Sequence, residues 1–184
     1  MGETVTAESI IEYWYSDEVK SKWFNSTIEF DKELKSKYES IWKDALRGEL
    51  MAWSENAEGC LALVIILDQF PLNMFRGEVE SFSSEAMAVR ITKKAIEQGF
   101  NKNIDKEKVA FLYMPLMHSE NIEDQNISVK LFEEAGLMDN LRFAKHHRDI
   151  IEKYGRFPHR NKILQRESSQ DEINYLNSDE AFTG

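Results

Sequence analysis

Residues 26–48, with the sequence STIEFDKELKSKYESIWKDALRG, decide the fold class of this chain. The apolar positions that matter in this stretch are Leu34, Tyr38, Ile41, Trp42 and Ala45. Their steps of three and four residues place them on one face of an α-helix. Ser26 and Glu29 have the spacing of a capping box, which predicts a helix start, and Gly48 can end the last turn with a positive φ. The stretch therefore predicts one amphipathic helix.

The same period returns toward the other end of the chain. Its apolar face holds Leu141, Ala144, Ile151 and Tyr154, with Phe143, His147 and Ile150 on an adjoining stripe. Gly155 stops this pattern, and Gly99 and Gly136 follow two further helix-like stretches. Ser169 and Glu172 repeat the capping-box spacing. Because no stretch alternates apolar and polar residues as a strand would, we predict an all-α fold of roughly seven to nine helices.

The sequence also bears on domain organisation and location. Its 184 residues contain no low-complexity linker and no clear repeat, so we predict a single all-helical domain over residues 1–184.

The longest apolar run, Cys60–Leu67, has eight residues, whereas a bilayer-spanning helix needs about 20, so we predict that this run lies in the core. Residues 1–6 carry no basic stretch followed by an apolar one, which predicts no secretory signal.

The net charge of the chain limits the classes of partner that we expect. With 23 basic and 33 acidic residues the net charge is −10, and such a chain is repelled by nucleic-acid backbones and anionic membranes. We therefore expect neither as a partner. The single cysteine, Cys60, cannot form a disulfide within the chain, which matches a reducing compartment, so we predict a cytoplasmic location.

The charges are unevenly distributed. Between Arg142 and Arg166, eight basic residues stand against two acidic ones, while the rest of the chain holds 15 basic and 31 acidic residues. Three of the four histidines, His146, His147 and His159, lie in the same basic stretch. Such a stretch can hold an anion through Coulomb attraction and bidentate arginine contacts, or it can pack against acidic helices of its own chain.

Three polar clusters coincide with the three prolines. They are Asp68–Gly77 around Pro71, Tyr113–Glu120 around Pro115 with the later Gln125, and Gly155–Asn161 around Pro158. Each proline is predicted to interrupt a helical pattern. Asp68 stands at the edge of the apolar run, where an unpaired carboxylate is costly, and Arg76 is its predicted partner. We also predict that the three clusters meet in space.

The second and third clusters suit either binding or catalysis. His118, Ser119 and Glu120 supply an acid, a base and a hydrogen-bond donor within three residues, or a loop anchored by hydrogen bonds. Arg156 and Arg160 flank His159, and two cations so close need an anion or carboxylates to offset their repulsion. The histidines and carboxylates are far apart in sequence, so we predict no metal site and no cofactor.

Three stretches together resemble the bacterial Domain of Unknown Function 924 family. They are LVIILDQFPLNMFRG, FLYMPLMHSE with the later Gln125, and HRDIIEKYGRFPHRNKILQRESSQDEINYL. The segments FDKEL and GELMAW extend the resemblance over nearly the whole chain, from near Trp14 to Phe182. The resemblance implies an all-helical domain of tetratricopeptide-like architecture, in which antiparallel helix pairs stack. It implies no established activity.

The resemblance also points to individual residues. Carried over by position, the polar residues characteristic of the family are Asp68, Gln69, Asn73, Arg76, His118, Ser119, Glu120, Gln125, His147, Arg156, His159, Arg160 and Asn161. We take these residues, apart from Ser119, as the candidate ligand-binding set. Two positions depart from the family pattern: Leu72 stands where the family often has arginine, and Gln165 replaces a frequent glycine before Arg166. The missing arginine weakens any grip on an anion from the first cluster.

Two functions from different classes fit these residues. In the leading hypothesis, a binding module holds an anionic small molecule or a peptide in a concave groove, through Arg156, His159, Arg160 and Asn161. In the alternative, a hydrolase uses His118 or His159 as general base, with Glu120 or Asp68 to orient it, and the arginines stabilise developing negative charge. The two differ in whether a histidine, a carboxylate and an arginine converge around a space for a reacting atom.

Overall fold

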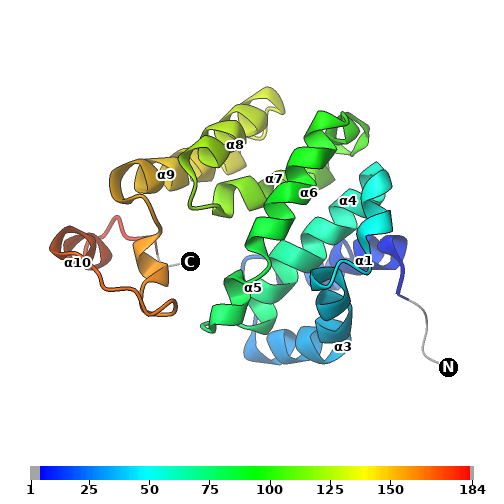
Figure 1. Cartoon of the computed structure of the whole chain (residues 1–184), viewed down its shortest axis with the longest axis horizontal. Coiled ribbons are helices and arrows are strands. Elements are labelled where there is room, and N and C mark those ends of the chain that lie inside the picture. Colours follow the sequence, from blue (N-terminus) through cyan, green and yellow to red (C-terminus); the bar gives the residue numbers. More distant parts are fainter. Residues whose placement is uncertain (1–4, 183–184) are drawn as a thin grey trace. The chain divides into compact units, whose positions relative to one another are not determined.

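The computed structural model describes residues 5–182 as helices joined by short connections, and these residues contain no β-strand (Figure 1). The predicted all-α fold is therefore confirmed. The chain divides into two compact units, unit 1 up to Pro115 and unit 2 from Leu116 onward. The single-domain prediction for the chain stays a prediction. Residues 1–4, part of the stretch read for a secretory signal, lie outside the described residues.

Unit 1 contains most of the helices. They are α1 (Ala7–Trp14), α2 (Asp17–Lys20), α3 (Ile28–Leu46), α4 (Ala57–Val64), the π-helical η2 (Ile65–Gln69), α5 (Phe70–Met74), α6 (Glu85–Glu97) and α7 (Lys106–His118), with 3₁₀ turns η1 (Met51–Glu55), η3 (Val79–Phe82) and η4 (Phe100–Asn103). Helix α7 passes the boundary after Pro115 and ends in unit 2. Because α4, η2 and α5 form one helix, residues 5–182 hold nine helices, within the predicted range.

Helix α3 is the amphipathic helix that residues 26–48 predict. Its buried positions are Phe30, Leu34, Tyr38, Trp42 and Ala45. It begins one residue later than predicted, because Thr27 is the N-cap and its hydroxyl accepts from the Phe30 N–H at 3.2 Å. The hydroxyl of Ser26 instead accepts a hydrogen bond from Arg76. Gly48 follows α3 with φ 79°, as its position predicts.

The helix formed by α4, η2 and α5 is the core of unit 1. Every residue of the run Cys60–Leu67 is buried, as predicted. The helix continues to Met74, and its 18 residues are long and apolar enough, by length and composition alone, to cross a membrane. The eight-residue run therefore understated the length of the apolar helix. Since 83% of this helix is buried inside the protein, it has the burial expected of a core helix.

Pro71 does not end this helix, contrary to the prediction. Proline has no N–H, so the carbonyl of Leu67 loses its usual helical partner. The hydroxyl of Ser84 donates to that carbonyl at 2.5 Å and accepts from Trp42 Nε1 at 3.0 Å. Pro115 likewise lies inside α7, so two of the three predicted interruptions are wrong. At Pro71, a tertiary contact from Ser84 supplies the hydrogen bond that the proline removes.

Unit 2 is built on a helical hairpin. Helices α8 (Ile122–Glu134) and α9 (Met138–Tyr154) pack side by side, and the 3₁₀ turn η5 (Pro158–Arg160) and α10 (Gln170–Leu176) follow (Figure 1). Gly155 closes α9 with φ 70°, as predicted. Leu141, Ala144 and Ile151 are buried, but Phe143 is 47% exposed, so its predicted place on an apolar stripe is wrong. The tetratricopeptide-like stacking of helix pairs stays a prediction.

Candidate functional site

The three polar clusters fall in different units. The first lies in unit 1, whereas the residues of the second from His118 onward and all of the third lie in unit 2. The second and third clusters meet. Arg160 donates to the carbonyl of His118 at the end of α7, and Glu120 accepts from Arg166 and from the Phe157 N–H. The predicted meeting of the first cluster with the other two stays a prediction.

In the first cluster, Asp68 and Gln69 lie in the π-helical turn η2, and both are buried. Gln69 Nε2 donates to Asp68 Oδ2 at 2.6 Å, and Asn73 Nδ2 donates to the Gln69 carbonyl at 3.0 Å. A π turn widens the helix and often occurs at functional sites. Here it places a buried carboxylate and two amides together on one helix.

Arg76 has a different carboxylate partner from the one predicted. Its Nε donates to Asp31 Oδ2 at 2.9 Å, and its Nη2 donates to Asn73 Oδ1 at 3.0 Å. The predicted pairing of Arg76 with Asp68 is wrong. Asp68 is buried in the core of unit 1. The Arg76 side chain lies beyond the end of α5 and is 58% exposed, so it pairs with a carboxylate nearer the surface.

The carbonyls at the end of α7 join the second cluster to the third. Gln125 Nε2 donates to the carbonyls of Met117 and Ser119, both at 2.7 Å. Arg160 Nη2 donates to the carbonyl of His118 at 2.9 Å. Carbonyls at a helix C-terminus lack helical partners and carry partial negative charge, so an amide and a cation suit them. Gln125 and Arg160 thus fix the end of α7.

Glu120 ties the same loop to the segment after α9. Its carboxylate accepts from the Phe157 N–H at 2.7 Å and from both terminal nitrogens of Arg166, at 2.6 and 2.9 Å. Arg166 Nε also donates to Asn161 Oδ1 at 3.0 Å. Burial alone would raise the pKa of Glu120, but the hydrogen bonds from Arg166 and Phe157 hold it below its usual range. Glu120 is therefore a fixed carboxylate.

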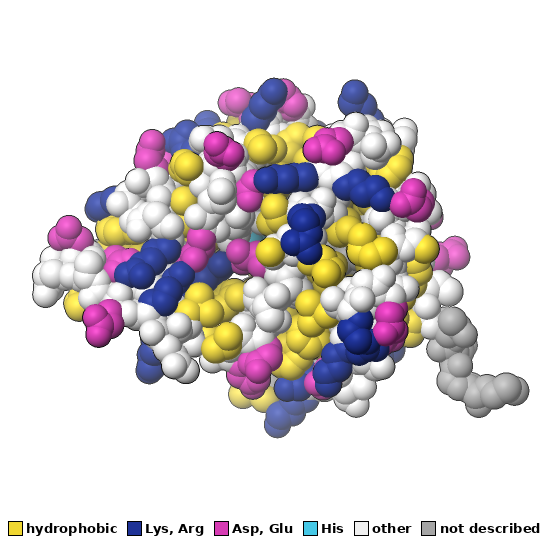
Figure 2. Space-filling view, in the orientation of Figure 1, with side chains coloured by type: hydrophobic (Ala, Val, Ile, Leu, Met, Phe, Trp, Pro, Cys, Tyr) yellow, Lys and Arg dark blue, Asp and Glu magenta, His cyan; other side chains and the backbone are white. Residues whose placement is uncertain are grey.

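Arg156 is paired in a similar way. Its Nε and Nη2 donate to the two carboxylate oxygens of Glu172 at 2.7 and 2.8 Å. Glu172 also accepts from the Ser169 N–H at 2.7 Å, which confirms the predicted capping box at α10. The Arg156 hydrogen bond is the main reason that the pKa of Glu172 falls to about 2. Figure 2 accordingly shows Lys and Arg side chains beside Asp and Glu side chains over the segment between α9 and α10.

Four aromatic side chains, His147, Phe157, His159 and Phe182, pack together and are called the ring cluster here. The ring centroid of Phe157 lies 5.4 Å from that of His147 and 5.6 Å from that of His159. The ring of Phe182 lies 4.4 Å from His147 and 5.0 Å from His159. The guanidinium carbon of Arg160 lies 4.6 Å from the centre of the Phe157 ring, a cation–π contact.

Both histidines of the ring cluster are neutral near pH 7. Burial lowers the pKa of His147 to about 3, against the opposing effect of its hydrogen bond to the Phe143 carbonyl at 2.7 Å. Burial also lowers the pKa of His159 to about 4, and the positive charge of Arg160 adds to this effect, while Glu120 opposes it. Arg160 and Arg166 therefore act on His159 with positive charge, and Glu120 acts on it with negative charge.

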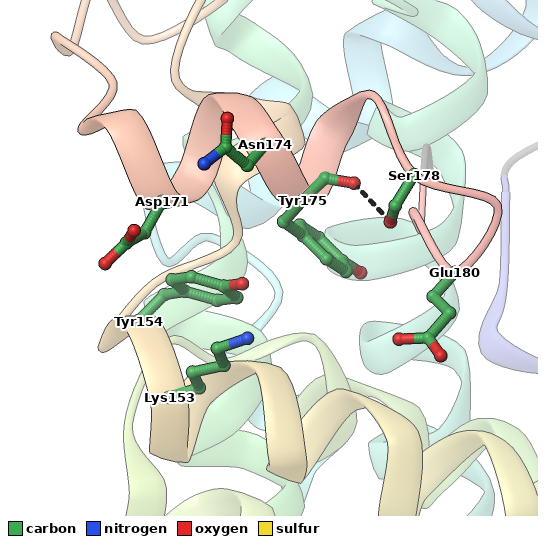
Figure 3. A pocket seen from close by; sticks show the side chains of 7 residues that line it. All are labelled: Lys153, Tyr154, Asp171, Asn174, Tyr175, Ser178 and Glu180. Atoms are coloured by element: carbon green, nitrogen blue, oxygen red, sulfur yellow. Dashed lines mark hydrogen bonds between the residues drawn. The ribbon is translucent and has the colours of Figure 1, made fainter.

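An open cleft of 420 Å³ lies beside the ring cluster, between the end of α9 and α10 (Figure 3). It is lined by Lys153, Tyr154, Asp171, Asn174, Tyr175, Ser178 and Glu180. The rings of Tyr154 and Tyr175 lie 5.3 Å apart, and the ammonium of Lys153 lies 5.0 Å from the centre of the Tyr154 ring. None of these residues belongs to the predicted ligand-binding set.

The contacts of Glu120 bear on the hydrolase alternative. Its carboxylate accepts hydrogen bonds from Arg166 and from the Phe157 N–H, and these contacts do not favour a role in orienting His118 or His159. A carboxylate with a lowered pKa is also a poor proton donor at neutral pH. Within residues 5–182, no group of three or more His, Cys, Asp or Glu residues could hold a metal ion.

Comparison with known proteins identifies the family. The profile of a family described as bacterial protein of unknown function (DUF924) matches residues 10–180. The chain belongs to this family. A solved structure, a protein of unknown function from Agrobacterium tumefaciens, is similar to this member of the DUF924 family at 36% identity, over 93% of this chain and 96% of that one, with a TM-score of 0.88. No curated protein gives a significant match. The resemblance inferred from the motifs is confirmed.

Three residues of this DUF924 site were not in the predicted set. Arg166 counted only as part of the basic stretch, and Glu172 only as half of a capping box. Phe182 marked only the end of the resemblance. The capping-box spacing of Ser169 and Glu172 was the one signal that pointed to Glu172. No local pattern pairs Glu172 with Arg156, 16 residues earlier.

Proposed function

We propose that the protein is a binding module and that unit 2 binds its ligand beside the ring cluster. The ligand is an anionic small molecule or a peptide that bears a carboxylate or a phosphate. His159 and Arg160 are the groups that contact it. The net charge of −10 repels nucleic acid and anionic membranes, which face the whole chain. A compact anion can instead bind at the basic stretch alone. We place this function in the cytoplasm.

The observation that carries this proposal is the electrostatic environment of His159. Its pKa is lowered to about 4, first by burial and then by Arg160. Glu120, the carboxylate that opposes this lowering, already accepts three hydrogen bonds from Arg166 and Phe157. An anion placed beside His159 and Arg160 would be attracted by the charge of Arg160 and would raise the pKa of His159.

Arg156 and Asn161 have a supporting part in this proposal. All three hydrogen bonds of Arg156 go to carboxylate or carbonyl oxygens of its own chain. Asn161 is 1% exposed and bonded to Arg166 and Ser168. These bonds hold the segment around His159 in one conformation. A rigid backbone lowers the entropy lost when a ligand binds.

Anion-dependent thermal unfolding tests the proposal. Phosphate and chloride at equal ionic strength are compared at about pH 5.5 and about pH 7.5. Phosphate should raise the melting temperature by mass action. The rise should be larger at the lower pH, because the bound anion raises the pKa of His159 and so couples binding to proton uptake.

Phosphate also stabilises proteins by exclusion from their surface, so the decisive quantity is the difference between variants. His159→Gln should lose the pH dependence of the phosphate effect, while His146→Gln, at the neighbouring histidine outside the ring cluster, should keep it. Equal effects of phosphate in the wild type and in His159→Gln, at both pH values, would contradict binding at this site.

A further inference from the structure

The segment after α10 has few attachments to the rest of unit 2. Residues Asn177–Glu180 are exposed. Beyond them, the Ala181 N–H donates to the Ser178 carbonyl at 3.2 Å, and the Phe182 N–H donates to the hydroxyl of Tyr175 at 2.9 Å. This segment, residues 177–182, is called the tail here. In Figure 1 it runs from α10 back toward the segment that follows α9.

Phe182 is the main contact of the tail. Its ring packs against His147 and His159 at 4.4 and 5.0 Å and lies 6.5 Å from the ring of Phe157. The other members of the ring cluster belong to α9 and η5 or lie just before η5. Without Phe182, they would form a site for one aromatic ring, bounded by two neutral imidazoles and a phenyl group. The chain fills that site with its own side chain.

Glu180 gives the tail a second contact region, in the cleft of Figure 3. Its carboxylate lines the cleft together with Lys153, whose ammonium lies near the ring of Tyr154. The pKa of Lys153 is raised first by Tyr154, and the negative charges of Asp171 and Glu180 add to this effect. The tail therefore places a carboxylate in the cleft that Lys153 also lines and, two residues later, an aromatic ring in the ring cluster.

We propose that unit 2 recognises an acidic peptide segment in which an aromatic side chain follows a carboxylate by two residues, and that the tail occupies this site as an internal competitor. The proposal names the partner class of the binding module described above and rests on it. The ammonium of Lys153, which lines the cleft beside Tyr154, complements the carboxylate of such a peptide.

A competitor within the chain has a defined thermodynamic effect. A tethered segment acts at an effective concentration in the millimolar range, so an external peptide must bind more tightly than the tail or be more abundant. The tail is held by the Phe182 ring, by the Phe182 N–H bond to the Tyr175 hydroxyl, and by bonds of Asn177 and Ser178 to carbonyls near the end of α10. It is displaced more easily than a packed helix. Displacement would expose His159 and raise its pKa toward the usual value of about 6.5, because burial is the main cause of its lowering.

The experiment uses the full chain with Phe182→Ala and an end-blocked peptide of sequence NSDEAF, which is that of residues 177–182. Binding is measured from the histidine ring resonances in NMR titrations. The peptide should bind the variant, and the same peptide with Phe182→Ala should bind at least about tenfold more weakly, because it cannot bury the phenyl ring. The peptide with Glu180→Lys should also bind more weakly. Wild-type chain should bind NSDEAF more weakly than the variant does.

Two further variants make the result specific. Glu180→Lys in the chain changes only the tail and no side chain of the ring cluster, and it places a second cation in the cleft that Lys153 lines, so it should loosen the tail, and peptide affinity should lie between that of the wild type and Phe182→Ala. Phe143→Ala removes an exposed phenylalanine from α9 and should behave as the wild type. Glu180→Lys also tests the proposal if Phe182→Ala does not fold.

The outcomes separate this inference from the proposed function. Equal binding of the peptides with and without phenylalanine, or equal binding by the wild type and both tail variants, overturns the recognition of an aromatic acidic segment. A phosphate titration of Phe182→Ala is the second arm. If phosphate shifts the His159 resonances and the peptides do not discriminate, the anion site stands and this inference fails. If the peptides discriminate and phosphate has no effect, the ring site stands and the phosphate site fails.

Discussion

The two units of the chain are built from different kinds of core. Among the described residues, unit 1 buries 30 apolar and seven polar or charged side chains, whereas unit 2 buries nine apolar and eight polar or charged ones. Burial of apolar surface stabilises unit 1 at any pH. The buried polar groups of unit 2 stabilise it only while each keeps its partner and its charge state. Unit 2 is therefore the part of the molecule that a proton or a ligand can change.

Acid should distinguish the units most strongly. The folded pKa of His147 is about 3, and that of an unfolded histidine is about 6.5, so between these values the unfolded state binds more protons and the free energy of unfolding falls as the pH falls. His147 alone should remove about 4 kcal/mol of stability over this range. Hydrogen exchange read by mass spectrometry should show unit 2 losing protection near pH 4 while unit 1 keeps it.

Matched histidine variants sharpen this acid test. His147→Leu should flatten the dependence of unfolding free energy on pH between about 6.5 and about 3. His146→Gln changes the adjacent histidine, which is only half-buried and whose ring lies 6.3 Å from that of His147, and it should alter the dependence less than His147→Leu does. Simultaneous loss of protection in both units would contradict the difference in their cores.

Unit 1 should instead be sensitive to added volume. Gly59, near the start of α4, lies so close to η1 that a Cβ atom there would be 1.9 Å from the Trp53 carbonyl oxygen. Gly59→Ala should therefore shift η1 and lower the free energy of unfolding by about 3 kcal/mol. Glu58→Ala, at the neighbouring exposed position, should change it by less than about 0.5 kcal/mol. Urea unfolding measures both, and equal effects would show that η1 moves aside freely.

The smallest expected effect is a gain in unit 2. Gln165 has φ 54° and is the one residue other than glycine with a positive φ among the described residues. Gln165→Gly should remove the strain of a Cβ atom in this conformation and stabilise the protein by about 0.5–1 kcal/mol. Gln165→Ala keeps the Cβ atom, so it should give no such gain. Urea unfolding of the two variants compares them, and destabilisation by glycine would contradict a strained backbone.

Gln165 illustrates how much the sequence could reveal about the site. The family resemblance placed a frequent glycine at this position, and the structure explains that glycine by the left-handed backbone. By contrast, no signal in the sequence paired Arg156 with Glu172 or Arg166 with Glu120. These pairs span 16 and 46 residues, and charge alone makes many other pairings equally suitable. The wrong pairing of Arg76 with Asp68 has the same cause.

Sequence alone determined the helices of this protein. Hydrophobic periods, the capping box at Ser169 and the glycine stops are local features, and the free energies of helix caps and turns depend on residues within one or two turns. The tertiary structure decided which polar groups meet. It placed Arg160 at the end of α7, kept the helix intact at Pro71 through Ser84, and buried Phe182 between His147 and His159. Those contacts depend on how distant helices pack, which no local pattern of residues specifies.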